Sequence, residues 1–210
     1  MEPFTRKEQA AIEKTITRAE AKTSGEIVVV VTGSSDGYRS FAILWAALLA
    51  LAVPLPLIWA TKWPVEHICL VQLATFLLFG ILFQWEPVRY ALAPKCVMRA
   101  RAHQKAIEQF LAQSLHTTKG RTGVLIFVSF AEHFAEIIAD EGIYRKVSHE
   151  IWNDLIVELT GHIAAGQRSE GFIKAIERCG KILAEHFPPG ASDADELPNH
   201  LIVLDAYRDA

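Results

Sequence analysis

The chain has 210 residues, of which 51% are apolar and 21% are charged. This length fits one domain of ordinary size with some chain left for an accessory element, and the apolar content predicts no disordered tail or charge-rich binding arm. The 24 Asp and Glu residues outnumber the 21 Lys and Arg residues, which gives a net charge of −3. We therefore expect no binding to nucleic acid. The cysteines lie far apart without Cys-x-x-Cys spacing, which indicates reduced thiols: Cys69, Cys96 and Cys179.

The first segment predicts a helix followed by a strand. Thr5 and Glu8 have the spacing of a capping box at the start of an amphipathic helix over residues 5–22. Residues 26–32 are mostly β-branched, and their run is too short for a helix. An uninterrupted apolar strand has both faces covered, so this pattern is typical of a central strand in a layered α/β sheet.

Two long apolar segments follow, and together they predict a transmembrane helical hairpin over residues 41–85. Residues 41–60 contain no charge, and twenty helical residues at about 1.5 Å each cross the hydrocarbon core. The second segment, residues 65–85, has eleven Leu, Ile, Val or Phe residues between positions 68 and 83, which outweigh Gln72 and the edge residues Glu66 and His67 on an insertion scale. Tryptophans occupy the positions expected for interfacial aromatics: Trp59, Trp63 and Trp85.

Two other interpretations of these segments are less favoured. A helical hairpin buried in a soluble core needs more surrounding protein than this chain provides, because both helices are apolar on all sides. A cleaved signal peptide is not expected, because about forty polar and structured residues precede the first segment. Pro54 and Pro56 bend the first helix without excluding it from a membrane.

Basic residues predict the orientation of the hairpin. Arg89 and Lys95 are the first of five cations that follow the second segment by residue 105, whereas the loop between the helices has only Lys62. The positive-inside rule then places both termini in the cytoplasm, with the chain in the cell (inner) membrane as a multi-pass protein. Contact of these cations with anionic lipid head groups is an alternative explanation for the cluster.

The remaining chain predicts more elements of the same sheet. Residues 97–119 form a helix with Ile107, Phe110, Leu111 and Leu115 on one side, and residues 123–129 form a second buried strand. A short turn leads to an antiparallel third strand, two helices and a short edge strand: 134–139, 147–166, 169–187 and 201–204. Strands 26–32 and 123–129 should be adjacent and parallel, joined by a crossover helix.

These elements predict one discontinuous α/β domain made of residues 1–40 and 90–210. Neither half has enough strands to fold alone, so the hairpin is an insertion and not a linker. The predicted fold class is α/β, a layered domain with a mixed sheet that a two-helix transmembrane hairpin interrupts.

Four sequence blocks resemble the TPM domain family: Lys22–Val31, Arg121–Ser129, Glu136–Gly142 and Glu196–Asn199. The resemblance spans nearly all of the chain outside the hairpin. It implies a three-layer αβα domain and, in some members, weak acid phosphatase activity or calcium binding. In bacteria, such proteins often accompany LemA-like membrane proteins. The chain differs from the secreted form of the family, because its hairpin follows the first strand and its domain is predicted to be cytoplasmic.

The best candidates for chemistry are Asp140 and Glu141, which with Gly142 follow the third strand. Carboxylates at a strand end can hold a divalent cation such as calcium. The alternative, an ordinary turn, is favoured because adjacent strand residues point to opposite faces. Asp193, Asp195 and Glu196 are a possible source of further oxygens, but a solvated loop is the favoured interpretation of that segment. The sequence carries no P-loop, dinucleotide-binding, GxSxG or HExxH motif, and no catalytic residue is assigned.

The predicted function is that of a membrane-tethered TPM-like module. It would act in protein interaction, or in assembly or regulation of a membrane complex, at the cytoplasmic face. Its expected partners are the lipid bilayer and another membrane protein, LemA-like by the resemblance. The alternative is a weak metal-dependent phosphatase of the TPM type, which needs a bound metal or an activated nucleophile. A transporter ranks third, because the hairpin has no acid or base within the membrane.

Overall fold

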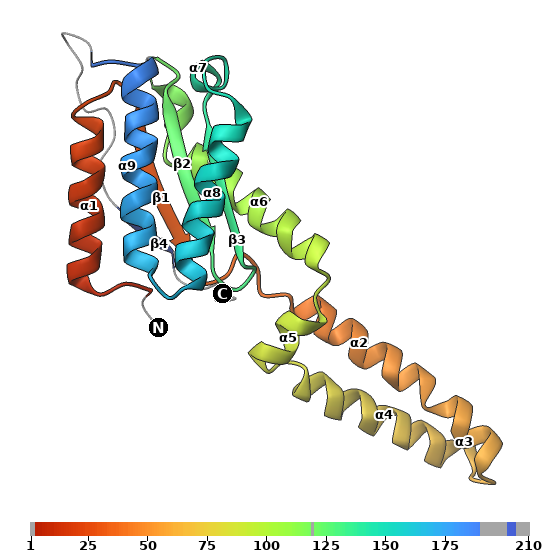
Figure 1. Cartoon of the computed structure of the whole chain (residues 1–210). Helices are drawn as coiled ribbons and strands as arrows, with labels where there is room; N and C mark the ends of the chain where they lie inside the picture. Colours follow the sequence, from red (N-terminus) through yellow and green to blue (C-terminus); the bar gives the residue numbers. More distant parts are fainter. Residues whose placement is uncertain (1–2, 119, 190–200, 205–210) are drawn as a thin grey trace. The chain divides into compact units, whose positions relative to one another are not determined.

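A computed structural model describes residues 3–118, 120–189 and 201–204. The described residues divide into two compact units (Figure 1). One contains the chain up to Ser35 and again from Ala100, and the other contains Asp36–Arg99. The α/β unit and the hairpin unit are described in turn.

A four-stranded mixed sheet forms the centre of the α/β unit, in the order β3-β2-β1-β4. β1 runs parallel to β2 and to β4, and β2 runs antiparallel to β3. The predicted parallel pair and the predicted antiparallel partner are both confirmed. The strands are β1 (Glu26–Thr32), β2 (Gly123–Ser129), β3 (Phe134–Ala139) and β4 (Leu201–Leu204).

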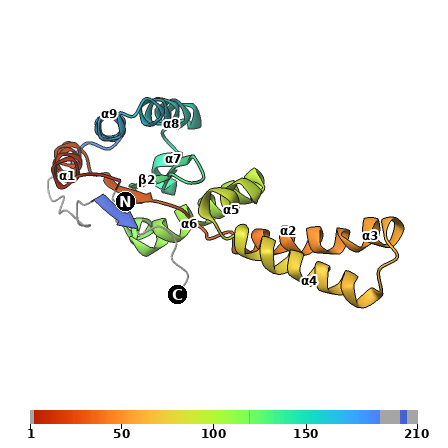
Figure 2. The same ribbon diagram turned by 90° about the horizontal axis from the view of Figure 1, so that it is seen from below.

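Helices cover both faces of this sheet, which confirms the α/β class and its three layers. In Figure 2, α1, α8 and α9 lie on one side and α6 lies on the other. Because side chains alternate along a strand, Ile27 and Val29 face the first layer, whereas Val28 and Val30 face α6. The helices are α1 (Arg6–Glu20), α6 (Lys95–Ala112), α8 (His149–Ala164) and α9 (Arg168–His186).

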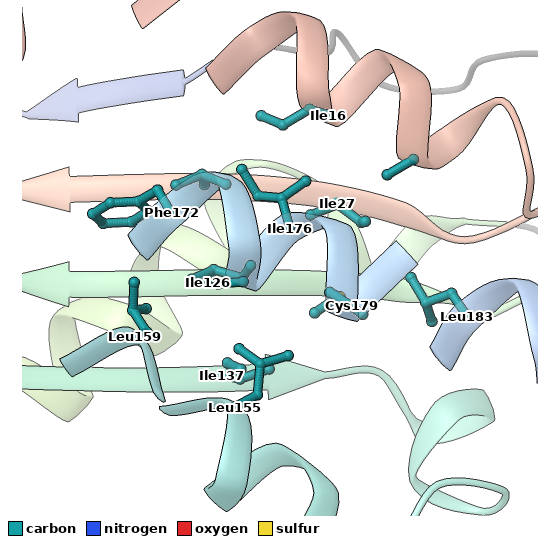
Figure 3. Close-up of a cluster of buried hydrophobic side chains, with 14 of the residues drawn as sticks. Ile16, Ile27, Ile126, Ile137, Leu155, Leu159, Phe172, Ile176, Cys179 and Leu183 are labelled. Carbon is teal, nitrogen blue, oxygen red and sulfur yellow. The ribbon is translucent and has the colours of Figure 1, made fainter. Parts of the chain in front are cut away.

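The larger core lies between the sheet and α1, α8 and α9 (Figure 3). Leu155 and Leu159 from α8 and Ile176 and Leu183 from α9 are fully or almost fully buried, and Ile16 joins them from α1. Burying one such side chain stabilises a fold by about 1.5–3 kcal/mol. Burial of these side chains therefore stabilises the packing of the three helices on this face of the sheet.

The amphipathic N-terminal helix begins as its capping box predicts. The Glu8 backbone N–H donates to the Thr5 hydroxyl at 3.3 Å, and the Thr5 backbone N–H donates to the Glu8 carboxylate at 2.8 Å. Hydrogen bonds from the Thr5 backbone and side chain lower the pKa of Glu8. Two of the orphan donors at the helix start are thereby satisfied.

The helix predicted over residues 97–119 is shorter and packs differently. α6 ends at Ala112, and a 3₁₀ turn over Leu115–Thr117 follows Ser114, whose left-handed backbone (φ 57°) cannot continue an α-helix. Phe110 and Leu115 are buried as expected, together with alanines of α6. Ile107 and Leu111 are instead exposed, so the predicted apolar side is split between the core and solvent.

The second unit contains α2 (Arg39–Ala52), α3 (Pro54–Ala60), α4 (Val65–Leu82) and α5 (Glu86–Leu92). Val53 keeps helical dihedrals, so α2 and α3 form one bent rod, interrupted because Pro54 has no N–H to donate. α2 and α4 pack against each other as a hairpin. Arg39–Ala60 and Val65–Leu82 are long and apolar enough to cross a membrane.

We expect Gly123→Ala to destabilise the protein by about 1–3 kcal/mol, the usual cost of overpacking. A Cβ at this position would lie 2.4 Å from the Leu115 carbonyl oxygen, which belongs to rigid backbone. The matched control is Gly161→Ala in α8, where an added Cβ meets nothing within 4 Å. That substitution should be neutral or stabilising by up to about 1 kcal/mol, because alanine favours a helix. Urea unfolding in detergent compares the two, and equal stabilities would contradict the packing.

Candidate functional site

The surface of the hairpin unit reverses the arrangement found in water-soluble proteins. The side chains of α2 that are buried are those of Ala42, Ala46 and Ala50, whereas large apolar side chains of the same helix point outward. On α4, Ile68 alone is buried. The exposed set includes Ile43, Leu44, Leu48, Leu49, Leu51, Leu55, Ile58, Leu70, Leu73, Leu77, Leu78, Ile81 and Leu82.

Small residues at the helix contact explain how α2 and α4 pack closely. Alanines four residues apart lie on one helix face and let the backbones approach, which is the usual way in which transmembrane helices associate. The one hydroxyl side chain of α4 is satisfied within its own helix, because Thr75 donates to the Val71 carbonyl oxygen at 2.8 Å. Thr75 therefore leaves no unpaired hydroxyl donor on α4.

The predicted metal ligands lie where β3 ends, at the edge where β1 and β2 begin. Asp140 has 5% of its surface exposed, and its Oδ2 lies 2.9 Å from Nε of Arg121. Its Oδ1 accepts the Glu141 backbone N–H at 2.7 Å, so Asp140 caps the short helix α7 (Glu141–Tyr144). The Asp140 Oδ2 is well placed for charge attraction to Arg121 but lacks good hydrogen-bond alignment.

Glu141 does not share a site with Asp140. Its carboxylate is exposed and pairs with Arg145 one turn later. The part of the chain that the structure describes holds no group of three His, Cys, Asp or Glu side chains able to bind a metal. Asp193, Asp195 and Glu196 lie outside the described residues. Calcium binding at Asp140 and Glu141 stays a prediction, which the amide shifts of residues 139–143 during a calcium titration would test.

Gly142 closes the turn beside Asp140. A Cβ there would lie 2.7 Å from the carbonyl oxygens of Gly120 and Arg121, and the Gly142 N–H donates to the Arg121 oxygen at 3.1 Å. Arg121 itself adopts a left-handed backbone with φ 53°. A left-handed residue other than glycine is strained and needs compensation, which here comes from its ion pair with Asp140 and from this backbone hydrogen bond.

A buried polar network, which the sequence did not reveal, occupies the opposite edge, where β1 and β2 end. The Glu132 carboxylate accepts the Ser35 backbone N–H at 2.9 Å and the Ser129 hydroxyl. The Ser35 hydroxyl in turn donates to Ser129 at 3.1 Å. All three residues are buried. The carboxyl edge of parallel strands is the usual ligand-binding edge of α/β sheets, but here its polar groups satisfy one another.

A cavity of about 250 Å³ adjoins this network. Its lining is mainly apolar, with polar contributions from Ser129, His133 and Thr160. His133 has a left-handed backbone (φ 48°) in the turn between β2 and β3. The volume and lining suit a small, mostly apolar group.

The cysteines are free thiols, as the spacing predicts. Cys69 and Cys96 are exposed in the hairpin unit, whereas Cys179 is fully buried in the core. Burial, with a smaller effect from the charge of Glu20, raises the pKa of Cys179 far above its usual value. Cys179 therefore stays a neutral packing residue and does not act as a nucleophile.

Comparison with known proteins adds a relationship of fold. No family model and no curated protein sequence matches the chain. The chain is similar to the NMR structure of the BA42 protein from the psychrophilic bacterium Bizionia argentinensis. The TM-score is 0.60 at 22% sequence identity, and the match covers 96% of this chain and 96% of that one. At this identity the similarity shows the α/β fold alone.

Arg121→Gln should lower the free energy of unfolding by about 1–3 kcal/mol, because it leaves the buried Asp140 carboxylate without its cation. The matched control is Arg145→Gln, which breaks the exposed pair with Glu141 and should cause no measurable change. Urea unfolding in detergent at neutral pH measures both variants. Equal effects would show that the Arg121–Asp140 pair adds no more than a surface ion pair.

Proposed function

We propose that this chain is a multi-pass protein of the cell membrane, in which a hairpin tethers a TPM-like α/β domain at the cytoplasmic face. The domain acts there as an interaction module in the assembly or regulation of a membrane complex. The proposal combines the hairpin, the basic residues beside it and the sequence resemblance to the TPM family.

The reversed burial of the hairpin is the observation that carries the proposal. In the most apolar 18 residues of each rod, the share that is buried within the protein is 17% for Arg39–Ala60 and 6% for Val65–Leu82. A soluble core helix would bury its large side chains, each worth about 1.5–3 kcal/mol. Here leucines and isoleucines are outside and alanines inside, which is stable when lipid is the solvent.

Charges at the ends of the rods support the orientation. Lys62 is the one basic residue between them, whereas Arg89, Lys95 and Arg99 follow the second rod within the same unit. Because basic residues stay on the cytoplasmic side during insertion, this asymmetry favours cytoplasmic termini. The exposed free thiol of Cys96 suits the same reducing compartment.

An exposed apolar pair on α6 supports a role in binding another protein. Ile107 and Leu111 are one helical turn apart, and their exposed fractions are 41% and 52%. Residues four apart on a helix form one continuous patch, and such patches recur in helix-mediated recognition. The resemblance to the TPM family makes a LemA-like membrane protein the partner to test first.

Membrane insertion predicts resistance to alkaline carbonate and a defined sidedness. The full chain should remain in the pellet after carbonate washing of vesicles, because apolar helices stay in lipid when peripheral contacts are broken. Reporters fused at either terminus should be active in the cytoplasm, whereas a reporter inserted in residues 61–64 should be active outside. Release by carbonate would contradict the membrane hairpin, and an inverted reporter pattern would contradict the orientation alone.

If Ile107 and Leu111 bind a partner protein, replacing both with polar residues should weaken that binding. A second membrane protein, with a LemA-like protein tested first, should co-purify with the wild type in mild detergent. The amount that co-purifies should fall severalfold in the double variant Ile107→Ser with Leu111→Ser. The control is Val157→Ser on α8, which is also exposed but lies in the other helix layer. Equal co-purification of all three proteins would contradict binding through α6, and a lone monomer across several detergents would argue against the interaction role.

A further inference from the structure

The segment that follows the second membrane rod contains a buried arginine. Arg89 lies in α5, and 7% of its surface is exposed. The same unit holds a small core of Tyr38, Ala93 and Met98, against which Tyr90 packs. α5 also packs on α2, and the Leu92 carbonyl oxygen accepts the indole N–H of Trp45 at 3.2 Å.

Among the described residues, the Arg89 side chain has no carboxylate partner, and its buried Nε has no hydrogen-bond acceptor. The contact it does make is with the ring of Tyr90, whose centroid lies 5.7 Å from Cζ, and this ring gives weak attraction and no hydrogen bond.

A buried charge without a partner is strongly unfavourable, so its retention points to an anion. A guanidinium presents N–H donors in a planar fork that matches two oxygens of a phosphate. We propose that Arg89 binds the phosphate of an anionic phospholipid at the edge of the membrane. This inference rests on the proposed membrane insertion and adds a specific lipid site to it.

Position and charge favour a lipid over a soluble phosphate. Arg89 follows the end of α4 at Leu82 by seven residues, and Trp85 between them is exposed, as interfacial tryptophans are. Lys95 and Arg99 lie in the same unit and are exposed. Such cations attract anionic lipid to the surface by about 1 kcal/mol each. The Arg89 guanidinium would add hydrogen bonds of fixed geometry to the phosphate and so orient the head group.

Native mass spectrometry of the full chain in detergent tests the site by titration with phosphatidylglycerol and phosphatidylcholine. The wild type should bind one phosphatidylglycerol about tenfold more tightly than Arg89→Gln does, as expected for loss of a charge-assisted contact. The control Arg99→Gln removes an exposed cation of the same unit and should change the affinity by no more than about fivefold. Equal binding by the wild type and Arg89→Gln would overturn the proposal, as would equal affinity for the two lipids.

A third titration with inorganic phosphate separates the two sources of the anion. Binding of inorganic phosphate as tight as that of phosphatidylglycerol, and lost in Arg89→Gln, would assign the site to a soluble anion and overturn the lipid proposal. Thermal unfolding shows whether Arg89→Gln is folded, since a folded variant has a cooperative transition. It also reports binding, because phosphatidylglycerol should raise the Tm of the wild type and not that of Arg89→Gln. If that variant does not fold, Arg89→Lys replaces it, since lysine keeps the charge and loses the fork.

Membrane insertion and lipid binding can fail separately. Arg89→Gln should stay in the carbonate-resistant pellet, because the apolar rods are unchanged. Retention without Arg89-dependent lipid binding would overturn the lipid site and leave the membrane proposal standing. Carbonate release of the wild type would remove the basis of both.

Discussion

The solvent around residues 39–82 is the constraint on which the organisation of this protein depends. In α2 the side chains of Ala42, Ala46 and Ala50 are buried, while Ile43, Trp45 and the leucines are exposed. Water would favour the opposite arrangement, because the hydrophobic effect buries the largest apolar surfaces first. Lipid removes that preference and leaves close packing as the main attraction between helices, for which alanine serves better than leucine. The same geometry would make a soluble hairpin prone to aggregation, and it suits the bilayer that we propose as its surroundings.

The place at which the hairpin enters the chain follows from the topology of the sheet. β1 and β2 are parallel neighbours, so a crossover connection must carry the chain from the end of one to the start of the other. α6 provides the part of this crossover that covers the sheet. The hairpin lies between β1 and α6 in the sequence, where a parallel connection already has to be long. An insertion in the tight turn between β2 and β3 would instead have separated two antiparallel strands.

Local patterns were predictable from the sequence, and contacts between distant residues were not. The runs at 26–32 and 123–129 gave the strands because continuous β-branched residues suit a sheet covered on both faces. Their parallel pairing followed from the crossover. The Ser35–Glu132 contact was not predictable, because it joins residues 97 positions apart and neither forms a motif. The exposure of Ile107 and Leu111 on α6 was also not predictable. Periodicity identifies the apolar side of a helix but does not show how much of that side the sheet covers.

Asp140 shows how a chemical pattern in the sequence differs from a chemical site. The acidic pair after β3 indicated oxygen ligands, but charge signals in a sequence omit the cation that folding brings beside them. In the structure Arg121 lies at Asp140 in place of a second carboxylate, and Glu141 turns to Arg145. A divalent ion at Asp140 would have to displace a guanidinium 2.9 Å away and recruit oxygens from elsewhere. Arg89 is the reverse case: the sequence presents it as one of a basic cluster, and it is buried with no anionic partner among residues 3–118, 120–189 and 201–204. Arg89 therefore has a stronger physical reason to bind a ligand than Asp140, whose charge is already paired with Arg121.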